Sequence, residues 1–392
     1  MTTAQATATK LAFTCPVDAL LEATAKLLTV IPASSPKPVL SNIHFSIRDG
    51  VLELSGTDAT SGFYYLIPAA TITEEGQGLL NGARFSELLK EFRGVDAKIT
   101  FNPRGGCQFG AKGGRYKVVG DDIRDYPITK RFEGISGLPI TGAELVDMVK
   151  KTAFAAAPEE SRLTINGVLF EFKDGRLRLV ATDNKRMAIS ERKIDSQLDP
   201  FSVSVPQSFL KAVIKASSKD VAGKDAVLGV DGTKVFFRLP SATVYSTTLQ
   251  GAYPPYEEAL AISLKHFIDC STIELLSTIR RAMLANDALS AFTWSVDQLT
   301  LSTVSATYGA GAATMPITLE LPEDVEQIRV GFNPSFFKDA LEAMPSKRCR
   351  FYFQGPRNAG VLKELLTEGE GDEAKEVVSE RYTYAVMPAL LP

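Results

Sequence analysis

The sequence predicts an α+β protein made of three repeats of one domain. The stretch Leu177–Met187, which runs LRLVATDNKRM, has an earlier relative at Leu52–Asp58 and a weaker one at Leu299–Ser305. Equivalent positions at the ends of these stretches lie 125 and then 122 residues apart. That period is too long for a solenoid repeat and is about the length of one small domain. The chain of 392 residues is therefore expected to hold three similar domains.

The same elements surround each copy in the same order. An alternating apolar strand precedes each stretch, and a short turn joins the two at positions 49–50, 174–175 and 297–298. The first two turns are Asp-Gly, a strong hairpin signal between alternating runs, and the third is Asp-Gln. A helix pattern follows each hairpin, carried by Phe85, Leu88, Leu89 and Phe92, then by Phe209, Leu210, Val213 and Ile214, then by Phe336, Phe337, Leu341 and Met344.

Each repeat also opens with a helix. Pro16–Thr29 has leucines at helical spacing, and capping boxes at Thr141–Glu144 and Ser271–Glu274 start the other two opening helices. The order of elements is thus helix, strands, helix, strands, which favours two similar halves per domain with both helices on one face of the sheet. The expected domains are 11–128, 139–256 and 266–392, with linkers near 128–138 and 257–266.

The charge of the chain is nearly balanced, and the acidic excess is local. The net charge of −3 argues against a nucleic-acid partner unless positive charge is segregated on one surface. Residues 363–380 hold seven acidic side chains and two lysines, a net charge of −5. This segment is expected to be a solvated loop between the last two strands.

The cysteines and the termini indicate a cytoplasmic protein without a metal. The four cysteines, at positions 15, 107, 270 and 349, lack metal-ligand spacing and are expected to be reduced, buried thiols. Residues 1–10 are rich in threonine and alanine and show no signal peptide. No apolar run approaches the ~20 residues of a membrane span. No cofactor is expected either.

No group of residues supports an enzyme. The only histidines are His44, in a strand pattern, and His266, in a linker, and neither has a nucleophile or metal partner. Gly105–Lys112 resembles a phosphate loop without its Gly-Lys-Ser/Thr ending, and Gly309–Gly311 is a partial dinucleotide fingerprint. Both are expected to be turns between strands. Asp58 and Asp183 are likewise expected to serve turns rather than a pair of catalytic acids, although an unrecognised hydrolase is a weaker alternative.

These motifs together resemble the β sliding clamp of bacterial DNA polymerase III, over roughly residues 11–392. The resemblance rests on four short motifs in order within a three-repeat chain: Gly56–Asp58, Asn166–Glu171 running into Ala181–Asp183 and Arg186, Gly331–Asn333, and Val386–Pro388. It implies a head-to-tail homodimer of six domains, with helices lining the hole of a ring and sheets on its outer rim. Such a ring encircles duplex DNA, slides on it and tethers the replicative polymerase.

A sliding ring needs diffuse positive charge towards the phosphates, because contacts to bases would fix its position. The resemblance implies that basic residues of the helices face DNA. The expected DNA-facing residues are Lys26, Lys90, Arg93, Lys150, Lys151, Lys211, Lys215, Arg280, Arg281 and Lys338.

The resemblance also implies an apolar groove between the second and third domains that binds short linear peptides of the polymerase, the clamp loader and repair proteins. An apolar pocket with a few polar groups suits an extended peptide. The expected groove residues are Ile165, Thr182, Asn184, Lys185, Arg186, Met187, Pro254, Ala259, Leu289, Asn333, Phe336, Val386, Met387, Pro388, Ala389 and Leu390.

The expected dimer interface joins the first repeat of one chain to the third repeat of the other. By resemblance, it would pack Tyr116 and Val118 near Met283 and Leu284. The main alternative function is that of a scaffold or regulator that keeps the fold without forming a ring on DNA.

Overall fold

The computed structural model describes most of the chain as two compact units. The first holds residues up to 146 together with 205–248, and the second holds 147–204 together with 249–392. The described residues are 10–127, 131–158, 164–216, 225–257, 266–286, 288–305, 307, 309–369 and 374–391. None of the helices within these ranges has the length and apolar character needed to cross a membrane. The division into three domains stays a prediction, because these units do not follow the repeat boundaries.

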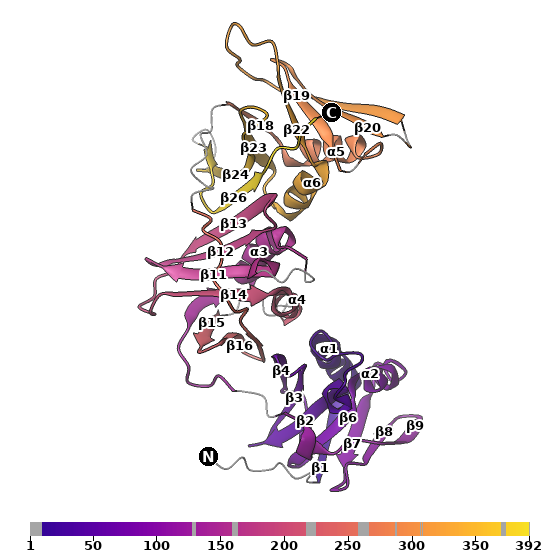
Figure 1. Ribbon diagram of the computed structural model, residues 1–392. Coiled ribbons are helices and arrows are strands. Elements are labelled where there is room, and N and C mark those ends of the chain that lie inside the picture. The colour runs from indigo at the N-terminus through magenta and orange to yellow at the C-terminus, as the bar shows by residue number, and fades with distance from the viewer. Residues whose placement is uncertain are drawn as a thin grey trace. The chain divides into compact units, whose positions relative to one another are not determined.

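The first unit contains two antiparallel sheets. One sheet has five strands, in the order β5 (Thr71–Glu74), β1 (Leu11–Pro16), β7 (Asp96–Phe101), β8 (Cys107–Ala111) and β9 (Gly114–Val118). The other has eight, in the order β10 (Leu138–Thr141), β15 (Asp225–Asp231), β16 (Lys234–Leu239), β17 (Ala242–Thr247), β4 (Ser61–Ile67), β3 (Val51–Thr57), β2 (Asn42–Arg48) and β6 (Gly76–Asn81). Helices α1 (Val17–Leu27) and α2 (Gly82–Lys90) pack side by side (Figure 1), and α4 (Gln207–Ala216) packs against β17.

The second unit repeats this plan. A nine-stranded sheet runs β14 (Phe201–Pro206), β11 (Gly167–Lys173), β12 (Arg176–Thr182), β13 (Arg186–Lys193), β26 (Tyr382–Val386), β24 (Gly360–Glu368), β23 (Arg348–Phe353) and β18 (His266–Ser271), with β25 (Lys375–Val378) paired to β24. A four-stranded sheet runs β21 (Gly309–Pro316), β20 (Gln298–Ser305), β19 (Ser290–Trp294) and β22 (Ile328–Phe332). Its helices are α3 (Gly142–Thr152, which starts in the first unit), α5 (Thr272–Ala282) and α6 (Pro334–Ala343).

The local signals of the sequence appear in the structure as expected. Asp49 and Gly50 close one two-residue hairpin, and Asp174 and Gly175 close another. All four residues have a positive φ, which most residues avoid for steric reasons. Thr141 and Glu144 form a reciprocal capping box, since each backbone N–H donates to the other side chain, at 3.1 and 3.2 Å.

Three local predictions need correction or limits. Gly309–Gly311 belongs to strand β21 and is not a turn. In Gly105–Lys112, only the two ends lie in turns, at Gly105 with φ of 84° and at Lys112 before β9, and Cys107–Ala111 is strand β8. Residues 363–380 form the end of the β24–β25 hairpin instead of a loop alone, and residues 370–373 lie outside the described residues.

All four cysteines are buried, as predicted, and all are free thiols. The sequence did not predict that two of them would meet: Cys270 of β18 lies opposite Cys349 of β23, with their Sγ atoms 3.9 Å apart. Burial raises the pKa of the Cys15 and Cys107 thiols to about 12. The Cys15 and Cys107 thiols therefore stay protonated and behave as core side chains.

Both large sheets join strands of different repeats, and they do so in the same register. In the first unit, the first residue of β4, Ser61, lies opposite Ser246 of β17. In the second unit, the first residue of β13, Arg186, lies opposite Val386, the last residue of β26. Ser61 and Arg186 are one repeat period apart, so equivalent residues of two repeats form the two inter-repeat strand pairs.

Candidate functional site

The C-terminal tail of the second unit is fastened to two repeats at once. The N–H of Met387 donates to the carbonyl of Lys185 at 2.8 Å, which continues the β13–β26 pair beyond Val386. The N–H of Ala389 donates to the carbonyl of Gly331 at 2.8 Å. A Cβ at Gly331 would lie 2.3 Å from the carbonyl oxygen of Ala389, so only glycine admits the tail at this point. The tail is therefore docked, although chain ends commonly fray.

A tight turn between β12 and β13 presents the second group of predicted groove residues. The Asp183 carboxylate accepts the N–H groups of Lys185 and Arg186 at 2.9 and 3.0 Å, and Asn184 takes a positive φ of 69°. Thr182 closes the turn by donating to the carbonyl of Arg186 at 2.7 Å. These bonds confirm a turn role for Asp183, and the turn residues Asn184 and Lys185 are exposed.

The first repeat builds the same turn with Asp58. Its carboxylate accepts the N–H groups of Thr60 and Ser61 at 2.7 and 2.6 Å, and Ala59 has a positive φ of 78°. The recurrence of this bond pattern explains why Thr-Asp appears twice in the sequence. It also confirms that Asp58 and Asp183 are structural residues.

Arg186 holds the turn, the third repeat and a short helix together. Its guanidinium bonds the carboxylates of Asp183 at 3.0 Å and Asp339 at 2.7 Å, and the carbonyl of Phe154 at 2.8 Å. It also lies 4.5 Å from the ring centre of Phe336, on whose face it stacks. Burial opposes its charge, but Tyr384, Asp339 and Asp183 outweigh that effect, so the pKa of Arg186 lies above its usual value. Arg186 is thus a positioning residue whose charge is neutralised by Asp183 and Asp339.

The apolar members divide into a buried floor and an exposed rim. Met187 is buried in a cluster with Leu169, Val180, Ile189 and Tyr256, and Ile165 is also buried. Leu390 is 93% exposed and Met387 is 54% exposed, although apolar side chains of that size usually avoid water. The floor is core packing, and the rim residues are those that a ligand could still cover.

The other predicted groove residues take varied positions. Val386 is fully buried, Asn184, Lys185 and Pro254 are exposed, and Thr182, Leu289, Asn333, Phe336, Pro388 and Ala389 are half-buried. Asn333 caps α6 by accepting the N–H of Ser335 at 2.9 Å, which fixes the start of the helix that carries Phe336. Ala259 lies outside the described residues.

Sequence reasoning missed the residues that orient this site. Asp339 bonds Arg186, and the Tyr384 hydroxyl donates to the carbonyl of Phe336 at 2.8 Å. Tyr253 donates its hydroxyl to the carbonyl of Val180 at 3.2 Å and packs on the cluster around Met187. Asp339 and Tyr384 occur in patterns typical of a solvated helix face and a core strand, so no signal in the sequence distinguished them.

Most of the predicted DNA-facing residues are accessible. Lys90, Arg93, Lys150, Lys211, Lys215, Arg280 and Arg281 are exposed or half-buried, and Lys338 is half-buried. Arg280 pairs with Glu342 at 2.8 Å on the surface. Exposed pairs of this kind are weak and remain available for exchange with a phosphate.

Two of these residues are buried, which corrects their assignment to a DNA-facing surface. The Nζ of Lys151 lies 3.0 Å from Glu364 and 3.2 Å from Asp147, and its side chain is 4% exposed. The Nζ of Lys26 lies 2.6 Å from Glu22, four residues earlier, and its side chain is 7% exposed. Lys26 and Lys151 therefore neutralise carboxylates of their own chain, and both leave the set proposed to face DNA.

His44 does not provide a catalytic group. Its ring nitrogens contact Ser55 at 3.2 Å and Gln77 at 3.1 Å in the first unit. Burial lowers its pKa to about 4, so the ring is neutral near pH 7. Within the described parts of the chain, no group of three or more His, Cys, Asp or Glu side chains is placed to hold a metal ion.

Two family models match the chain in order. Residues 11–129 match the N-terminal domain of the DNA polymerase III beta subunit, and residues 139–255 match its central domain. Together these matches span more than half of the chain.

Relatives and solved structures match nearly the full length of the chain. The chain is 24% identical to the "Beta sliding clamp" of Bacillus subtilis over 374 residues, covering 92% of this chain and 96% of that protein. It is 24% identical to the "Beta sliding clamp" of Chlamydia trachomatis, covering 86% and 80%. The crystal structure of the DNA polymerase sliding clamp from Bacillus subtilis superposes with a TM-score of 0.86 at 21% identity, covering 98% of this chain and all of that one.

A further structural relative is the sliding clamp from Pseudomonas aeruginosa bound to griselimycin, with a TM-score of 0.85 at 21% identity over 97% of this chain and all of that one. At such identities the structural likeness establishes the fold, and the matched family models establish the descent. The chain belongs to the family of the bacterial DNA polymerase III β subunit, the DNA sliding clamp of replication.

Proposed function

We propose that two copies of this chain close head to tail into a ring around duplex DNA, and that the docked tail forms part of a groove for partner peptides. The observation that carries the ring is the shared register of the two inter-repeat strand pairs. A contact between two different surfaces closes into a ring only when the same rotation between neighbours is repeated at every contact. The same strand pair at each boundary between repeats would give that constant rotation.

Two edge strands are available for the remaining boundary. β9 ends the five-stranded sheet of the first repeat, and β21 ends the four-stranded sheet of the third repeat. Setting Gly309, the first residue of β21, opposite the partner subunit's Val118, the last residue of β9, copies the register in which Arg186 faces Val386. Tyr116 would then face Gly311 of the partner subunit.

The side chains at this boundary support the register. Tyr116 is 47% exposed, and its ring packs edge-on against Phe92 with the centroids 5.7 Å apart. Gly311 opposite to it offers room, because a Cβ there would first meet Ala285 at 3.4 Å. Leu284, which comes shortly after α5, is 82% exposed and follows the helix that packs on β21. These exposed apolar groups are what a second copy of the chain would cover.

We expect the exposed lysines of the second repeat to contribute to weak, sequence-independent binding of duplex DNA. Replacing Lys150, Lys211 and Lys215 by alanine should reduce the slope of log affinity against log salt by about 0.9 for each phosphate that the variant no longer neutralises. The matched control replaces Lys173, Lys193 and Lys375, which are exposed cations on strands. If both triple variants change the slope equally, these helices do not face the DNA.

Retention on circular DNA tests the ring itself. A closed ring loaded on a nicked plasmid should remain bound during gel filtration and should leave after the plasmid is cut once. A scaffold that kept the fold without closing, the alternative function, would leave circular and linear DNA equally. Mass in solution gives an independent measure, since a ring of two chains has a mass near twice 42.4 kDa.

We expect the tail to contribute directly to peptide binding. Removing residues 387–392 deletes the exposed Met387 and Leu390 and the two backbone bonds that dock the tail. Covering one such side chain is worth roughly 1.5–3 kcal/mol, so the affinity for a fluorescent peptide from the replicative polymerase should fall about tenfold or more. The control Val296→Ser removes an equally exposed apolar side chain elsewhere, at 57% exposure. Unchanged affinity after the deletion would place the peptide on another surface.

A further inference from the structure

The five-stranded sheet of the first unit has a solvent-facing side that borders the ring boundary proposed at β9. On its buried face, Phe109 packs against Phe92 and Tyr116. Strand alternation turns the neighbours of these residues to the opposite face. A hollow of about 790 Å³ lies there, and its lining includes Lys98, Thr100, Gln108, Gly110, Arg115 and Lys117. We call this surface the basic hollow.

A glycine at the centre of the face makes the hollow. Gly110 of β8 lies opposite Lys98 of β7 on one side and opposite Arg115 of β9 on the other. It therefore leaves a gap between two long cationic side chains. A Cβ at Gly110 would meet nothing closer than the carbonyl oxygen of Lys98 at 3.9 Å, and its φ is not in the left-handed region. No packing constraint requires glycine at this position, so the gap itself is the distinctive feature.

The charge of the basic hollow is not balanced. Lys98, Lys112, Arg115 and Lys117 are all exposed, and Asp96 is the one acidic residue in the lining. Among the residues that the structure describes, none of these four cations forms an ion pair with a carboxylate. Four like charges on one sheet face repel one another, so this arrangement destabilises the free protein unless an anion binds.

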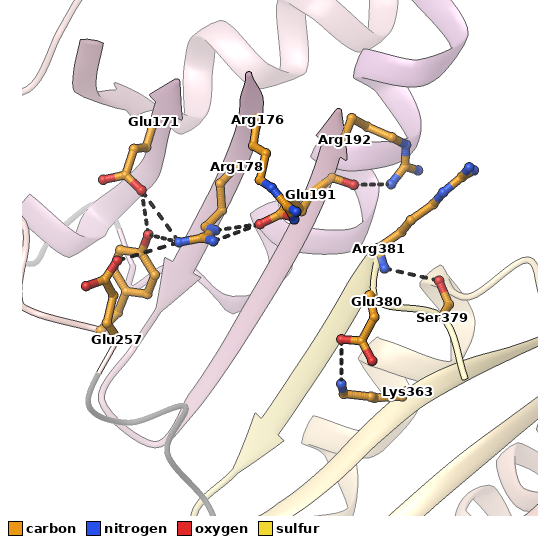
Figure 2. A network of polar contacts seen from close by, with 11 residues as sticks. Glu171, Arg176, Arg178, Glu191, Arg192, Glu257, Lys363, Ser379, Glu380 and Arg381 are labelled. Atoms are coloured by element: carbon orange, nitrogen blue, oxygen red, sulfur yellow. Dashed lines mark hydrogen bonds and ion pairs between the residues drawn. The ribbon is translucent and has the colours of Figure 1, made fainter. Parts of the chain in front are cut away.

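In the sheet of β11, β12 and β13 in the second unit, two arginines form ion pairs with carboxylates. Figure 2 shows Arg178 between Glu191 and Glu171, with Arg178 Nη2 2.8 Å from Glu191, and Arg176 bonded to the same Glu191. Lys363 pairs with Glu380 at 3.1 Å (Figure 2). Arg176, Arg178 and Lys363 thus have carboxylate partners, whereas the four cations gathered in the basic hollow have none among the residues that the structure describes.

We propose that the basic hollow binds an extended acidic segment of a partner protein. The Arg115 guanidinium can hold a carboxylate with two parallel bonds, and Lys98 and Lys117 supply charge on either side. Thr14, Thr100 and Gln108 offer hydroxyl and amide groups for the backbone of such a segment. Single-stranded nucleic acid fits less well, because Phe109 is buried and Tyr116 is the one exposed aromatic side chain in the lining, so successive bases would lack a series of rings to stack on.

The test measures binding of an eight-residue peptide of alternating glutamate and serine, labelled with fluorescein, to the full chain at low salt. The variant with both Lys98→Ala and Lys112→Ala should bind about fivefold more weakly, since two exposed pairs of roughly 0.2–1 kcal/mol each correspond to about two- to thirtyfold. The variant with both Lys37→Ala and Arg48→Ala removes the same charge from exposed positions outside the hollow and should change the affinity less than about twofold.

A third variant separates shape from charge. Gly110→Leu fills the gap without changing the net charge, and it should weaken peptide binding as strongly as the double lysine variant. Equal losses in the Lys37 and Arg48 control, or full binding by Gly110→Leu, would overturn the proposal. So would tighter binding of an eight-nucleotide oligothymidylate than of the peptide, lost in the same variants. Retention on circular DNA should be unchanged in all three variants, which keeps this test independent of the ring.

Discussion

Replacing Lys151 by methionine is expected to lower the free energy of unfolding by about 3–5 kcal/mol, the usual cost of removing one partner of a buried ion pair. Lys151 lies in α3 of the second repeat, and its partner Glu364 lies in β24 of the third repeat. Glu364 is only 3% exposed, so the substitution leaves its carboxylate buried without a cation. The loss should appear in urea denaturation followed by circular dichroism.

Lys150→Met is the matched control for this measurement. Lys150 is the preceding residue on the same helix and is exposed, so its replacement should change the stability by no more than about 0.5 kcal/mol. Replacing Lys151 by methionine and Glu364 by leucine together should recover most of the loss, because no buried charge then remains unpaired. A cost below about 1 kcal/mol for Lys151→Met alone would contradict the proposed importance of this pair.

Charged residues at the proposed ring boundary are expected to break the proposed ring of two chains into single chains. The variant with Tyr116→Glu and Leu284→Glu places carboxylates among apolar groups that the second copy should cover. Its mass by sedimentation should be near 42.4 kDa, and its retention on circular DNA should disappear. Val51→Glu with Val296→Glu carries the same added charge at exposed apolar positions outside this boundary, and it should leave the dimer intact.

Cysteine cross-linking examines the register of the same boundary. Lys117 should face Ala310 of the partner subunit, so Lys117→Cys with Ala310→Cys should join the two chains after mild oxidation. Opposite residues of an antiparallel pair lie within the range of Cα distances that a disulfide spans. Lys117→Cys with Ala312→Cys is offset by two residues, at about 7–8 Å, and should cross-link poorly. The reverse preference would mean that the third boundary does not copy the other two.

The sequence predicted the features of this fold that depend on neighbours along the chain. The Asp-Gly hairpins at positions 49–50 and 174–175 and the capping box at Thr141 follow from local backbone geometry, and all three are present. The repeat itself was visible because its turns and helices recur at a nearly constant spacing. Family resemblance supplied the ring, the groove and their residue sets, which spacing alone could not.

The features that escaped prediction depend on partners far along the chain. Lys151 has the spacing of a solvated helix residue, and only its contact with Glu364, 213 positions away, buries it. Arg186 was expected to line a peptide groove, and its contact with Asp339, 153 positions away, neutralises its charge. Strand pairing between repeats was not predicted either, because β17 and β4 carry no local signal for meeting each other. In each case the deciding interaction is tertiary.

The pairing of β4 with β17 has a consequence for what counts as an independent folding unit. A fragment that ended in the first linker would have β4 as the outer strand of its sheet, with backbone groups unpaired that the whole chain pairs between Ser61 and Tyr65. Open edges of this kind are templates for non-native association. The repeat is therefore a unit of sequence, while cooperative unfolding should follow the shared sheets that cross its borders.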